Sequence, residues 1–486
     1  MIDLLREDQT IAAIATAPAF GAIGIVRVSG KDAKEIAMRI FRPRRPVSQL
    51  KSHRVYYGFV HSIGADSVLI DEAIGIFMQA PHSYTREDVF EIQCHGGPAV
   101  TRKILEAVLS CGAREAEPGE FTRRAFLNGR IDLSQAEAVM ELVTAVTDLQ
   151  RQAAIGALSG NMSHSIQIVR EEAVEVLARI EAELDFPEDG LELQSIEVLC
   201  RSISEKILDP IHALITSYDT RHIVRDGVRV VMAGRPNTGK SSLFNALLGI
   251  SRVLVSPIPG TTRDSIEENL EINGLLVTLV DTAGIRQNTS DVIESMGMDI
   301  TQREMEKGHH LVVLIDCSQS LSHEDLHLLK NIRTGRPVTV VLNKVDLLNG
   351  IFAQPSCFHD GVNGLPVTAQ IKAVLLEQGI SEAVLLPVSA KTGFGLDRLK
   401  ERIVNAALSD SAMSLDFPVP TLRQRDILMK AVVSFESAKD LLKNGSDLEI
   451  VAIELRNGLS RLNDILGLEA NEDVLNRIFS RFCIGK

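Results

Sequence analysis

The pattern of hydrophobic and polar positions divides the chain into stretches of different periodicity. Up to about residue 130, short alternating or apolar runs surround one stretch with helical spacing. Such runs predict strands that bury at least one face, and strands mixed with a helix predict a compact α+β domain. The runs cover residues 23–28, 55–60, 73–78 and 89–93, and the helical stretch covers 99–109.

Helical periodicity dominates from residue 133 to about 221 and returns after residue 408. Apolar residues recur there three and four positions apart, as one face of an amphipathic helix requires. In the first stretch they are Ala136, Val139, Leu142, Val143, Val146 and Leu149, then Val169, Ala173, Val176, Leu177, Ile180 and Leu184. In the second they are Leu422, Ile427, Leu428, Ala431, Val432 and Phe435, then Leu448, Val451, Ala452, Leu455, Leu459 and Leu462. The segment 185–190 should break the first stretch.

Neither helical stretch has enough apolar surface to fold alone. We expect the two to pack together as one bundle, with the intervening segment inserted between them. A movement of the inserted segment would then act on the bundle at both points where the chain passes from one to the other.

Within the inserted segment, apolar strand-like runs each end in a polar motif. The run 228–233 is followed by Gly-Arg-Pro-Asn-Thr-Gly-Lys-Ser at 234–241, and then by a helix-like run at 243–248. A strand, a glycine loop and a helix in this order predict a phosphate-binding loop, in which Lys240 supplies positive charge and the Ser241 hydroxyl can bind Mg²⁺. The expected contacts with the nucleotide are Asn237, Thr238, Gly239, Lys240, Ser241 and Ser242.

A second motif, Asp281-Thr282-Ala283-Gly284, ends the apolar run 275–280. Asp281 can hold the shell of the Mg²⁺ ion, and the amide of Gly284 can meet a γ-phosphate. This motif therefore predicts a sensor of the third phosphate.

Two further motifs predict which base the bound nucleotide carries. Asn343-Lys344-Val345-Asp346 follows the run 338–342, and a carboxylate at Asp346 can accept two parallel N–H bonds from the edge of guanine. Adenine offers no matching pair of donors. Ser389-Ala390-Lys391 follows the run 383–388, where a loop amide suits the guanine O6 atom.

A stretch without clear periodicity lies between the first two motifs and is predicted to be a switch loop. Thr262 is the better candidate there for a second hydroxyl on Mg²⁺. The residues of this loop expected to contact the nucleotide are Ser256, Pro257, Ile258, Pro259, Gly260, Thr261 and Thr262.

The position after Gly284 is Ile285, where Ras-like proteins carry a glutamine that positions water. Isoleucine cannot do this, so another polar group must. Arg286, Gln287 and Glu294 are the candidates, and the residues alone do not choose among them. The Asn237 side chain could help to bind a monovalent cation in the place of an arginine finger.

Composition and charge limit the kind of protein further. With 486 residues, 45% of them apolar, the chain suffices for about three domains with substantial cores. No apolar run approaches the length of a membrane span, and the first residues are acidic where a targeting peptide would be basic, so we expect a cytoplasmic protein without a membrane anchor. The formal net charge of −13 argues against broad binding of nucleic acid, so any RNA contact should be local.

The six cysteines are scattered without a Cys-x-x-Cys pair, which predicts reduced thiols and neither a zinc site nor a disulfide framework. They are Cys94, Cys111, Cys200, Cys317, Cys357 and Cys483.

Several other segments complete a specific set. They are Gly24-Ile-Val-Arg27-Val-Ser-Gly30, Tyr84-Thr-Arg-Glu-Asp-Val89 with Glu91, His95-Gly-Gly97, Pro118-Gly-Glu-Phe-Thr122, Arg124-Ala-Phe-Leu-Asn-Gly-Arg130 and the final Phe482-Cys-Ile-Gly-Lys486. With the four nucleotide motifs, they make the chain resemble the MnmE (TrmE) family of tRNA modification GTPases along essentially its whole length.

The resemblance implies a K⁺-stimulated GTPase that works with the FAD-containing flavoprotein MnmG. Such proteins add an aminomethyl or carboxymethylaminomethyl group to carbon 5 of the wobble uridine in certain tRNAs. A tetrahydrofolate derivative, 5-formyl- or 5,10-methylene-tetrahydrofolate, is expected to supply the one-carbon unit. The resemblance also implies a homodimer through the N-terminal domain and a heterotetramer with MnmG.

Matching positions carry over the residue roles of the family. They imply folate contacts at Arg27, Glu91, Arg130 and Lys486, and a catalytic glutamate at Glu294, three residues before Gly297. They imply potassium contacts at the Asn237 side chain, Ser256, the Ile258 carbonyl and Thr261. Cys483 could be a nucleophile toward the uracil ring, but nothing nearby in the sequence indicates an activated thiolate, so a packing or positioning role is favoured.

The expected fold class is multidomain, α/β and α. It combines an N-terminal α+β folate-binding-like domain (1–130), a helical bundle formed from two chain segments (131–224 and 408–486) and an inserted Ras-like P-loop GTPase domain (225–407). The alternative function is a GTP-dependent switch of ribosome assembly, similar to Era or Der. Such proteins typically append a KH-like RNA module, and no Gly-x-x-Gly loop in a basic setting follows residue 408.

Overall fold

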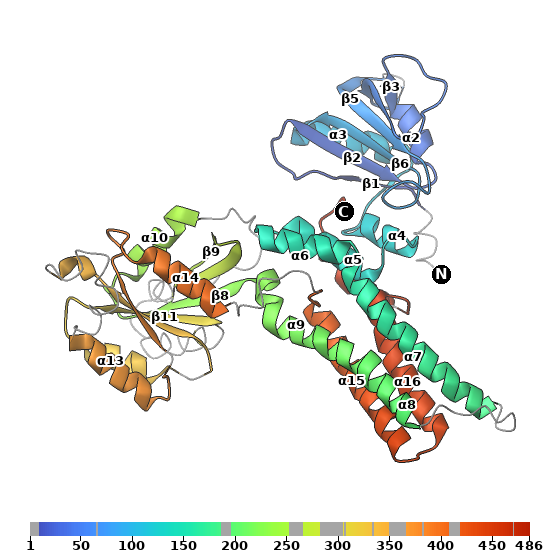
Figure 1. The fold of residues 1–486 in the computed structure, drawn as a ribbon. Helices are drawn as coiled ribbons and strands as arrows, with labels where there is room; N and C mark the ends of the chain where they lie inside the picture. The colour runs from blue at the N-terminus through green and yellow to red at the C-terminus, as the bar shows by residue number, and fades with distance from the viewer. Residues whose placement is uncertain are drawn as a thin grey trace, which may run out of the picture. The chain divides into compact units, whose positions relative to one another are not determined.

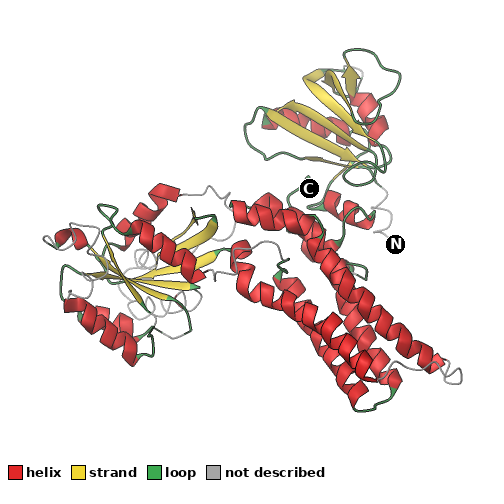
Figure 2. Cartoon of the chain, viewed as in Figure 1, coloured by secondary structure: helices red, strands yellow, loops and turns green. Residues whose placement is uncertain are grey.

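The computed structural model describes residues 9–64, 67–185, 196–251, 266–281, 305, 308–332, 335–348, 366–381, 383–407, 418–469 and 471–486. The chain forms two compact units of helices and strands (Figures 1 and 2). Unit 1 combines the chain up to Met140 with Ala157–Pro210 and Asp426–Lys486, and unit 2 combines Glu141–Gly156 with Ile211–Arg425. Each unit therefore joins segments that are far apart in the sequence. The domain boundaries expected from the sequence, which divide the chain after residues 130, 224 and 407, stay a prediction.

Unit 1 contains a seven-stranded sheet in the order β3-β4-β5-β6-β2-β1-β7. Neighbouring strands are antiparallel except for β1 and β7, which are parallel. The strands are β1 (Ile11–Ile14), β2 (Ile23–Ser29), β3 (Phe41–Pro43), β4 (Arg54–His61), β5 (Leu69–Met78), β6 (Val89–His95) and β7 (Arg114–Glu115). The four strands expected from the apolar runs are confirmed as β2, β4, β5 and β6.

Helices α2 (Ala33–Ile40) and α3 (Pro98–Leu109) cover one face of this sheet. Their apolar side chains pack with Val26, Val28 and Phe90, which point to the same face. Because successive side chains of a strand alternate between faces, Arg27 and Glu91 belong to the opposite face. Helix α4 (Glu120–Leu127) packs there through Phe121.

The helical part of unit 1 pairs helices from distant parts of the chain. Helix α7 (Asn161–Asp185) lies along α16 (Leu448–Leu466) (Figure 1). Arg170 Nε donates to Asn463 Oδ1 at 2.7 Å, and Arg456 forms an ion pair with Glu181 at 2.6 Å. The prediction of one bundle built from two chain segments is therefore confirmed. The other helices that contribute to unit 1 are α8 (Ile196–Ser202), the π-helix η1 (Ile203–Leu208), α15 (Leu422–Lys443) and α17 (Glu472–Phe479).

The helical spacing from residue 136 to 149 showed no break, but the structure has one between α5 (Leu133–Thr144) and α6 (Asp148–Leu158). Thr147 Oγ1 accepts the N–H of Gln150 at 3.3 Å, and Gln150 Oε1 accepts the N–H groups of Val146 and Thr147 at 3.0 and 3.3 Å. This reciprocal Thr-x-x-Gln pair is a capping box, which starts a new helix. Apolar spacing continues through the break and so did not reveal it.

Unit 2 contains a six-stranded sheet in the order β13-β12-β11-β8-β10-β9, parallel except for β9. The strands are β8 (Val228–Ala233), β9 (Ile266–Ile272), β10 (Leu275–Asp281), β11 (His310–Asp316), β12 (Val338–Asn343) and β13 (Val384–Val388). Helices α10 (Lys240–Ser251) and α14 (Leu396–Ala407) cover one face, and α12 (His323–Lys330) and α13 (Pro366–Glu377) cover the other. Both faces are buried, which explains the almost continuous apolar runs of these strands. Unit 2 also holds the 3₁₀ helix η3 (Val345–Leu347) and most of α9 (Asp209–Asp226).

A dependence of stability on pH is expected from His310, at the start of β11. Its ring is buried, and Nε2 lies 2.8 Å from Thr339 Oγ1. Burial, with a smaller effect from the charge of Arg402, lowers the pKa of His310 to about 4. The unfolded chain binds this proton more readily, so its contribution to stability should be complete above about pH 6.5 and be lost as the pH falls toward 4, by about 3 kcal/mol in total.

Urea unfolding of the full chain between pH 4 and 8 measures this decline. His310→Gln keeps a hydrogen-bonding group near Thr339 but does not titrate, so its stability should fall less steeply between pH 4 and 6.5. Equal slopes for the two proteins would show that His310 does not carry the effect.

Candidate functional site

The predicted phosphate-binding segment joins β8 to α10 at the carboxyl edge of the unit 2 sheet. Asn237 and Gly239 have positive φ angles of 63° and 93°, so the chain turns tightly before the helix. Lys240 begins α10 and is buried, with Nζ donating to the carbonyl oxygens of Gly234 at 2.6 Å and Arg235 at 2.8 Å. A glycine turn that leads into a helix N-terminus directs N–H groups toward an anion. The loop thus has the geometry that a phosphate group requires.

Asn343, the last residue of β12, ties two of the predicted loops together. Its Nδ2 donates to the Thr238 carbonyl at 2.8 Å, and its Oδ1 accepts the N–H of Ala390 at 3.1 Å. The side chain is buried, so both hydrogen bonds are shielded from water. Asn343 therefore holds the phosphate loop and the loop after β13 at a fixed separation.

The predicted base-recognition carboxylate also contacts its partner motif. Ser389 Oγ donates to Asp346 Oδ1 at 2.6 Å and accepts the N–H of Thr392 at 3.2 Å. Because the serine proton is directed at one carboxylate oxygen, the orientation of the Asp346 side chain is defined. Two motifs that are 43 residues apart thus meet as one arrangement.

Asp316, which ends β11, was not among the predicted residues. Lys344, in the left-handed region at φ 68°, reaches it with Nζ 2.7 Å from Oδ2. Burial opposes ionisation of Asp316, but hydrogen bonds from Lys344 and Ser318 outweigh it and hold the pKa below its usual value. Asp316 is therefore an anchor for the Asn-Lys-x-Asp motif, and the signal that could have revealed it is a carboxylate directly after a strand-like run.

The remaining predicted residues divide by where they lie. Asp281 ends β10 at the same sheet edge and is buried, whereas Ser241, Ser242 and Lys391 are exposed. Ser241 and Asp281 carry the types of oxygen that Mg²⁺ prefers. The predicted residues outside the described part of the chain are Ser256, Pro257, Ile258, Pro259, Gly260, Thr261, Thr262, Thr282, Ala283, Gly284 and Glu294, together with the alternatives Arg286 and Gln287.

A second group of predicted residues lies on unit 1, on the sheet face that α4 covers. Arg27 Nε donates to Glu91 Oε1 at 2.8 Å, and the Arg27 guanidinium lies 5.7 Å from the ring centre of Tyr84. Arg130 lies over the same ring at 4.7 Å and donates to the Tyr84 carbonyl at 3.3 Å. The structure thus brings Arg27, Glu91 and Arg130 together around an aromatic ring that had no predicted role.

The last residues of the chain return to this group. Arg27 Nη1 donates to the Gly485 carbonyl at 3.2 Å, and the N–H of Phe121 donates to the Lys486 carbonyl at 3.2 Å. The N–H of Gly119 lies 3.5 Å from the carbonyl of Cys483, whose residue is exposed. The last residues, 483–486 (the tail), therefore lie between α4 and β2, and Lys486 lies next to the group formed by Arg27, Glu91 and Arg130.

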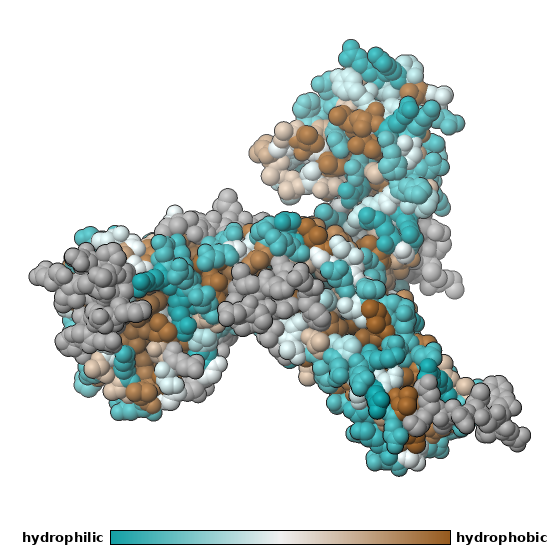
Figure 3. Space-filling model, in the orientation of Figure 1, coloured by the Kyte–Doolittle hydropathy of each residue, from teal (hydrophilic) through white to brown (hydrophobic). Residues whose placement is uncertain are grey.

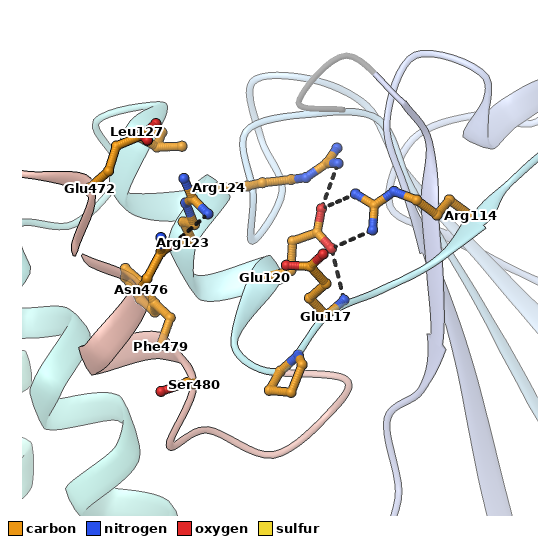
Figure 4. A pocket seen from close by; sticks show the side chains of 11 residues that line it. Arg114, Glu117, Glu120, Arg123, Arg124, Leu127, Glu472, Asn476, Phe479 and Ser480 are labelled. Atoms are coloured by element: carbon orange, nitrogen blue, oxygen red, sulfur yellow. Dashed lines mark hydrogen bonds and ion pairs between the residues drawn. The ribbon is translucent and has the colours of Figure 1, made fainter. Parts of the chain in front are cut away.

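A charged network holds α4 in place beside a pocket of about 290 Å³. Glu120 accepts hydrogen bonds from Arg114 and Arg124, which Figure 4 shows approaching it from two sides. Burial raises the pKa of Glu120, but hydrogen bonds from Arg114 and the Glu117 N–H, together with the charge of Arg124, outweigh it and keep the pKa below its usual value. Arg123 Nη1 reaches Asn476 of α17 at 3.3 Å, so the terminal helix is joined to α4.

Gly485→Ala should displace the tail. Gly485 has φ 93°, and a Cβ there would lie 2.5 Å from the Ile14 carbonyl oxygen, against main chain that cannot move aside. We expect the hydrogen exchange of the Phe121 amide to rise at least tenfold while the fold of the domain persists.

Gly445→Ala is the matched control, because Gly445 also has positive φ, 65°, but nothing lies within 4 Å of its Cβ position. Unchanged protection of Phe121 in Gly485→Ala, with the tail still docked, would contradict the prediction.

Two family models match the chain. The model described as "GTP-binding protein TrmE N-terminus" matches residues 10–130, and the model described as "MnmE helical domain" matches residues 133–483. The chain belongs to the MnmE family. The expected membership and the fold class that came with it are confirmed.

Relatives within the MnmE family match over their full length. A tRNA modification GTPase MnmE from Symbiobacterium thermophilum is 43% identical over 482 residues, which is 99% of this chain and 100% of the relative. Another from Geobacter sulfurreducens is 41% identical over 485 residues, 99% of each chain. The ribosome-assembly alternative is therefore not favoured.

Two solved structures that resemble the chain each cover part of it. A variant of Era from Aquifex aeolicus bound to GDP and AlF₄⁻ is 27% identical, covers 43% of this chain and 66% of its own, and has a TM-score of 0.29. The G domain of the FeoB iron transporter from T. maritima is 24% identical, covers 37% of this chain and 98% of its own, and has a TM-score of 0.25. Among the described helices of this MnmE-family chain, none is both long and apolar enough to cross a membrane.

Proposed function

We propose that this MnmE-family protein hydrolyses GTP and uses that reaction in the modification of the wobble uridine of tRNA. The observation that carries the proposal is the joining of three nucleotide motifs at one sheet edge by Asn343 and Ser389, in a chain whose full-length relatives are named tRNA modification GTPases. Loops at the carboxyl ends of parallel strands are the usual place for a nucleotide.

The roles proposed for the nucleotide site follow the chemistry of its residues. Lys240 and the N–H groups from Asn237 to Ser242 hold the phosphates, Asp346 selects guanine, and Ser241 with Thr262 holds Mg²⁺. Asp281 holds the water shell of the Mg²⁺ ion. The main-chain amide of Gly284 contacts the third phosphate and so distinguishes GTP from GDP.

We also propose that potassium serves as the charge-stabilising cation. It would be held by the Asn237 side chain, Ser256, the Ile258 carbonyl and Thr261, with Glu294 positioning the attacking water. Asn237 is exposed in the turn before α10, so its side-chain carbonyl is accessible to a cation.

A tetrahydrofolate derivative is proposed for the cluster on unit 1. Arg27, Arg130 and Lys486 provide positive charge for the glutamate tail, and Glu91 can accept from the donor edge of a pterin. Tyr84 adds an aromatic surface on which a flat ring can stack.

The sheet face that carries this cluster also supports a homodimer. Hydrophobic residues gather on the visible surface of the N-terminal part (Figure 3), and Val55, Tyr57 and Ile74 are 64%, 44% and 37% exposed. Tyr57 and Ile74 are paired across β4 and β5, so their side chains form one patch. Sedimentation equilibrium should give the mass of two chains.

The proposed assembly adds MnmG, with its FAD, to make a heterotetramer that acts on tRNA in the cytoplasm. Carbon 5 of the uridine would receive an aminomethyl or carboxymethylaminomethyl group, with the one-carbon unit taken from 5-formyl- or 5,10-methylene-tetrahydrofolate. We keep a positioning role for Cys483.

The modification proposal is tested by mass spectrometry of tRNA nucleosides from cells that lack this chain. We expect the group at carbon 5 of the wobble uridine to disappear and to return with the wild-type gene. Normal uridine chemistry together with defective ribosomal subunits would instead support the assembly role.

Glu294→Ala tests the hydrolytic step. The variant should bind GTP with unchanged affinity but hydrolyse it at least about 100-fold more slowly, because the group that orients water is lost. Turnover is measured in KCl and in NaCl. Surviving turnover would transfer the role to Gln287 or Arg286, and wild-type rates that are equal in the two salts would exclude the potassium site.

A further inference from the structure

A cavity of about 500 Å³ lies in unit 2 at the amino edge of the sheet. Its walls come from the residues just before and at the starts of β12 and β13, from the turn after α13 and from the last turns of α14. The nucleotide motifs are at the carboxyl edge, separated from it by the length of the strands, about 20 Å. The cavity is therefore distinct from the site proposed for GTP.

The described residues that line the cavity carry positive charge only. Arg336 and Arg402 both line it, and no acidic residue is among the described residues that do so. The Nε of Arg402 is buried and has no hydrogen-bond partner. Among the described residues, Arg336 Nη1 donates to the main-chain carbonyls of Met305 and of Gly308, the latter at 3.1 Å. In the part of the chain that the structure describes, neither guanidinium forms an ion pair.

Two guanidinium groups that line one cavity repel each other, and an anion bound between them would relieve that repulsion. A guanidinium presents a planar fork of donors that fits an oxyanion, and two of them provide two positive charges. At neutral pH a phosphate monoester carries a charge of about −1.5 to −2, which matches that pair, whereas a carboxylate would balance only one of them. The hydroxyl of Ser381, at the rim, can donate to a third oxygen.

We propose that this cavity binds a phosphate group, supplied either by inorganic phosphate or by a small phosphomonoester. The cavity is open to solvent on one side, and its volume suits a small molecule and exceeds that of phosphate alone. Burial and then the charge of Arg402 lower the pKa of the neighbouring His310, so a bound phosphate should move that pKa back upward. The proposal does not depend on the function proposed above.

Equilibrium dialysis with ³²P-labelled inorganic phosphate tests it. The full chain is saturated with Mg²⁺ and a non-hydrolysable GTP analogue, so that the phosphate loop is occupied, and chloride keeps the ionic strength constant. We expect one phosphate per chain with a dissociation constant of about 1 mM or lower, the affinity of a few charge-assisted hydrogen bonds. Less than 0.1 phosphate per chain at about ten times that concentration would overturn the proposal.

Two variants locate the bound phosphate. Arg402→Met should raise the dissociation constant at least tenfold, and Ala406→Phe should do the same by filling the cavity while both arginines stay. Arg398→Met on the same helix does not line the cavity and should bind as the wild type does. Loss of binding in Arg398→Met equal to that in Arg402→Met, or no loss in Ala406→Phe, would overturn the assignment.

Competition distinguishes the possible sources. Glycerol phosphate that displaces the label at least as well as unlabelled phosphate supports a phosphomonoester, and weaker displacement supports inorganic phosphate. Acetate at the same ionic strength should displace none. Equal displacement by acetate would overturn the choice of phosphate over carboxylate.

Discussion

Gly239→Ala should reduce the affinity for GTP about 100-fold or more. Gly239 has φ 93°, where a side chain is strained by about 1–3 kcal/mol. An added Cβ would also lie 2.3 Å from Asn343 Nδ2, the atom that donates to the Thr238 carbonyl. Relief of this contact must move the phosphate loop or turn the amide away, and each lost hydrogen bond costs about 1 kcal/mol more.

Fluorescence titration with a labelled GTP analogue measures the loss. Gly249→Ala is the matched control, since Gly249 lies in α10, has no positive φ and has nothing within 4 Å of its Cβ position. The control should bind normally and be slightly more stable, because alanine favours a helix. Normal binding by Gly239→Ala would mean that the loop does not hold the phosphates in the arrangement described.

Asp346→Asn should exchange the preference for guanine for a preference for xanthine nucleotides. The carboxylate offers two acceptors to the two N–H groups of guanine, whereas the introduced amide offers one acceptor and one donor. Ser389 Oγ already donates to Oδ1 of Asp346, so the amide oxygen should stay on that side and its NH₂ group should replace the second acceptor. Xanthine has a carbonyl where guanine has an amino group, and it pairs with that donor.

The expected change is a loss of about 100-fold in GTP affinity and a comparable gain for XTP, since each charge-assisted hydrogen bond contributes about 1.5–3 kcal/mol. Competition of GTP, XTP and ATP for the same labelled analogue measures both. Asp397→Asn removes an equal charge from an exposed position of α14 and should leave all three affinities unchanged. Unaltered GTP binding without a gain for XTP would remove Asp346 from the base site.

The two substitutions separate the parts of one site. Gly239→Ala should weaken GTP and XTP alike, because both carry the same phosphates. Asp346→Asn should affect only the choice of base. Asn343 links the two loops, so the effects in a double variant should not add simply.

Much of unit 2 could be predicted from its sequence, for a physical reason. Strands of a parallel sheet that are covered on both faces need apolar side chains at nearly every position, so β8, β10 and β12 appear as clear apolar runs. Short elements such as β3 and β7 leave no such pattern because two or three residues cannot show a period. The break before α6 was missed because the side-chain caps of Thr147 and Gln150, and not a loss of apolar spacing, end one helix and begin the next.

In the candidate sites, too, some residues could be predicted from the sequence and others could not. Motif spacing predicted nucleotide contacts at Lys240, Asp346 and Ser389, because each chemical requirement falls on a short segment next to a strand. Their neighbours could not be named in this way. Asp316 meets Lys344 only because β11 and β12 are adjacent, and Tyr84 lies against Arg130 only because a loop and a helix end converge.

The sequence by itself determined the kinds of element and the family, and it supplied the residue types on which the proposals for phosphate, guanine and folate rest. These depend on local periodicity and on short segments, which a linear chain displays directly. The tertiary structure decided which of those residues touch: the tie of Asn343 between two loops, the return of Gly485 to Arg27, and the paired arginines of the second cavity. Contacts between residues up to 458 positions apart depend on how strands and helices pack, and that packing is a property of the folded chain as a whole.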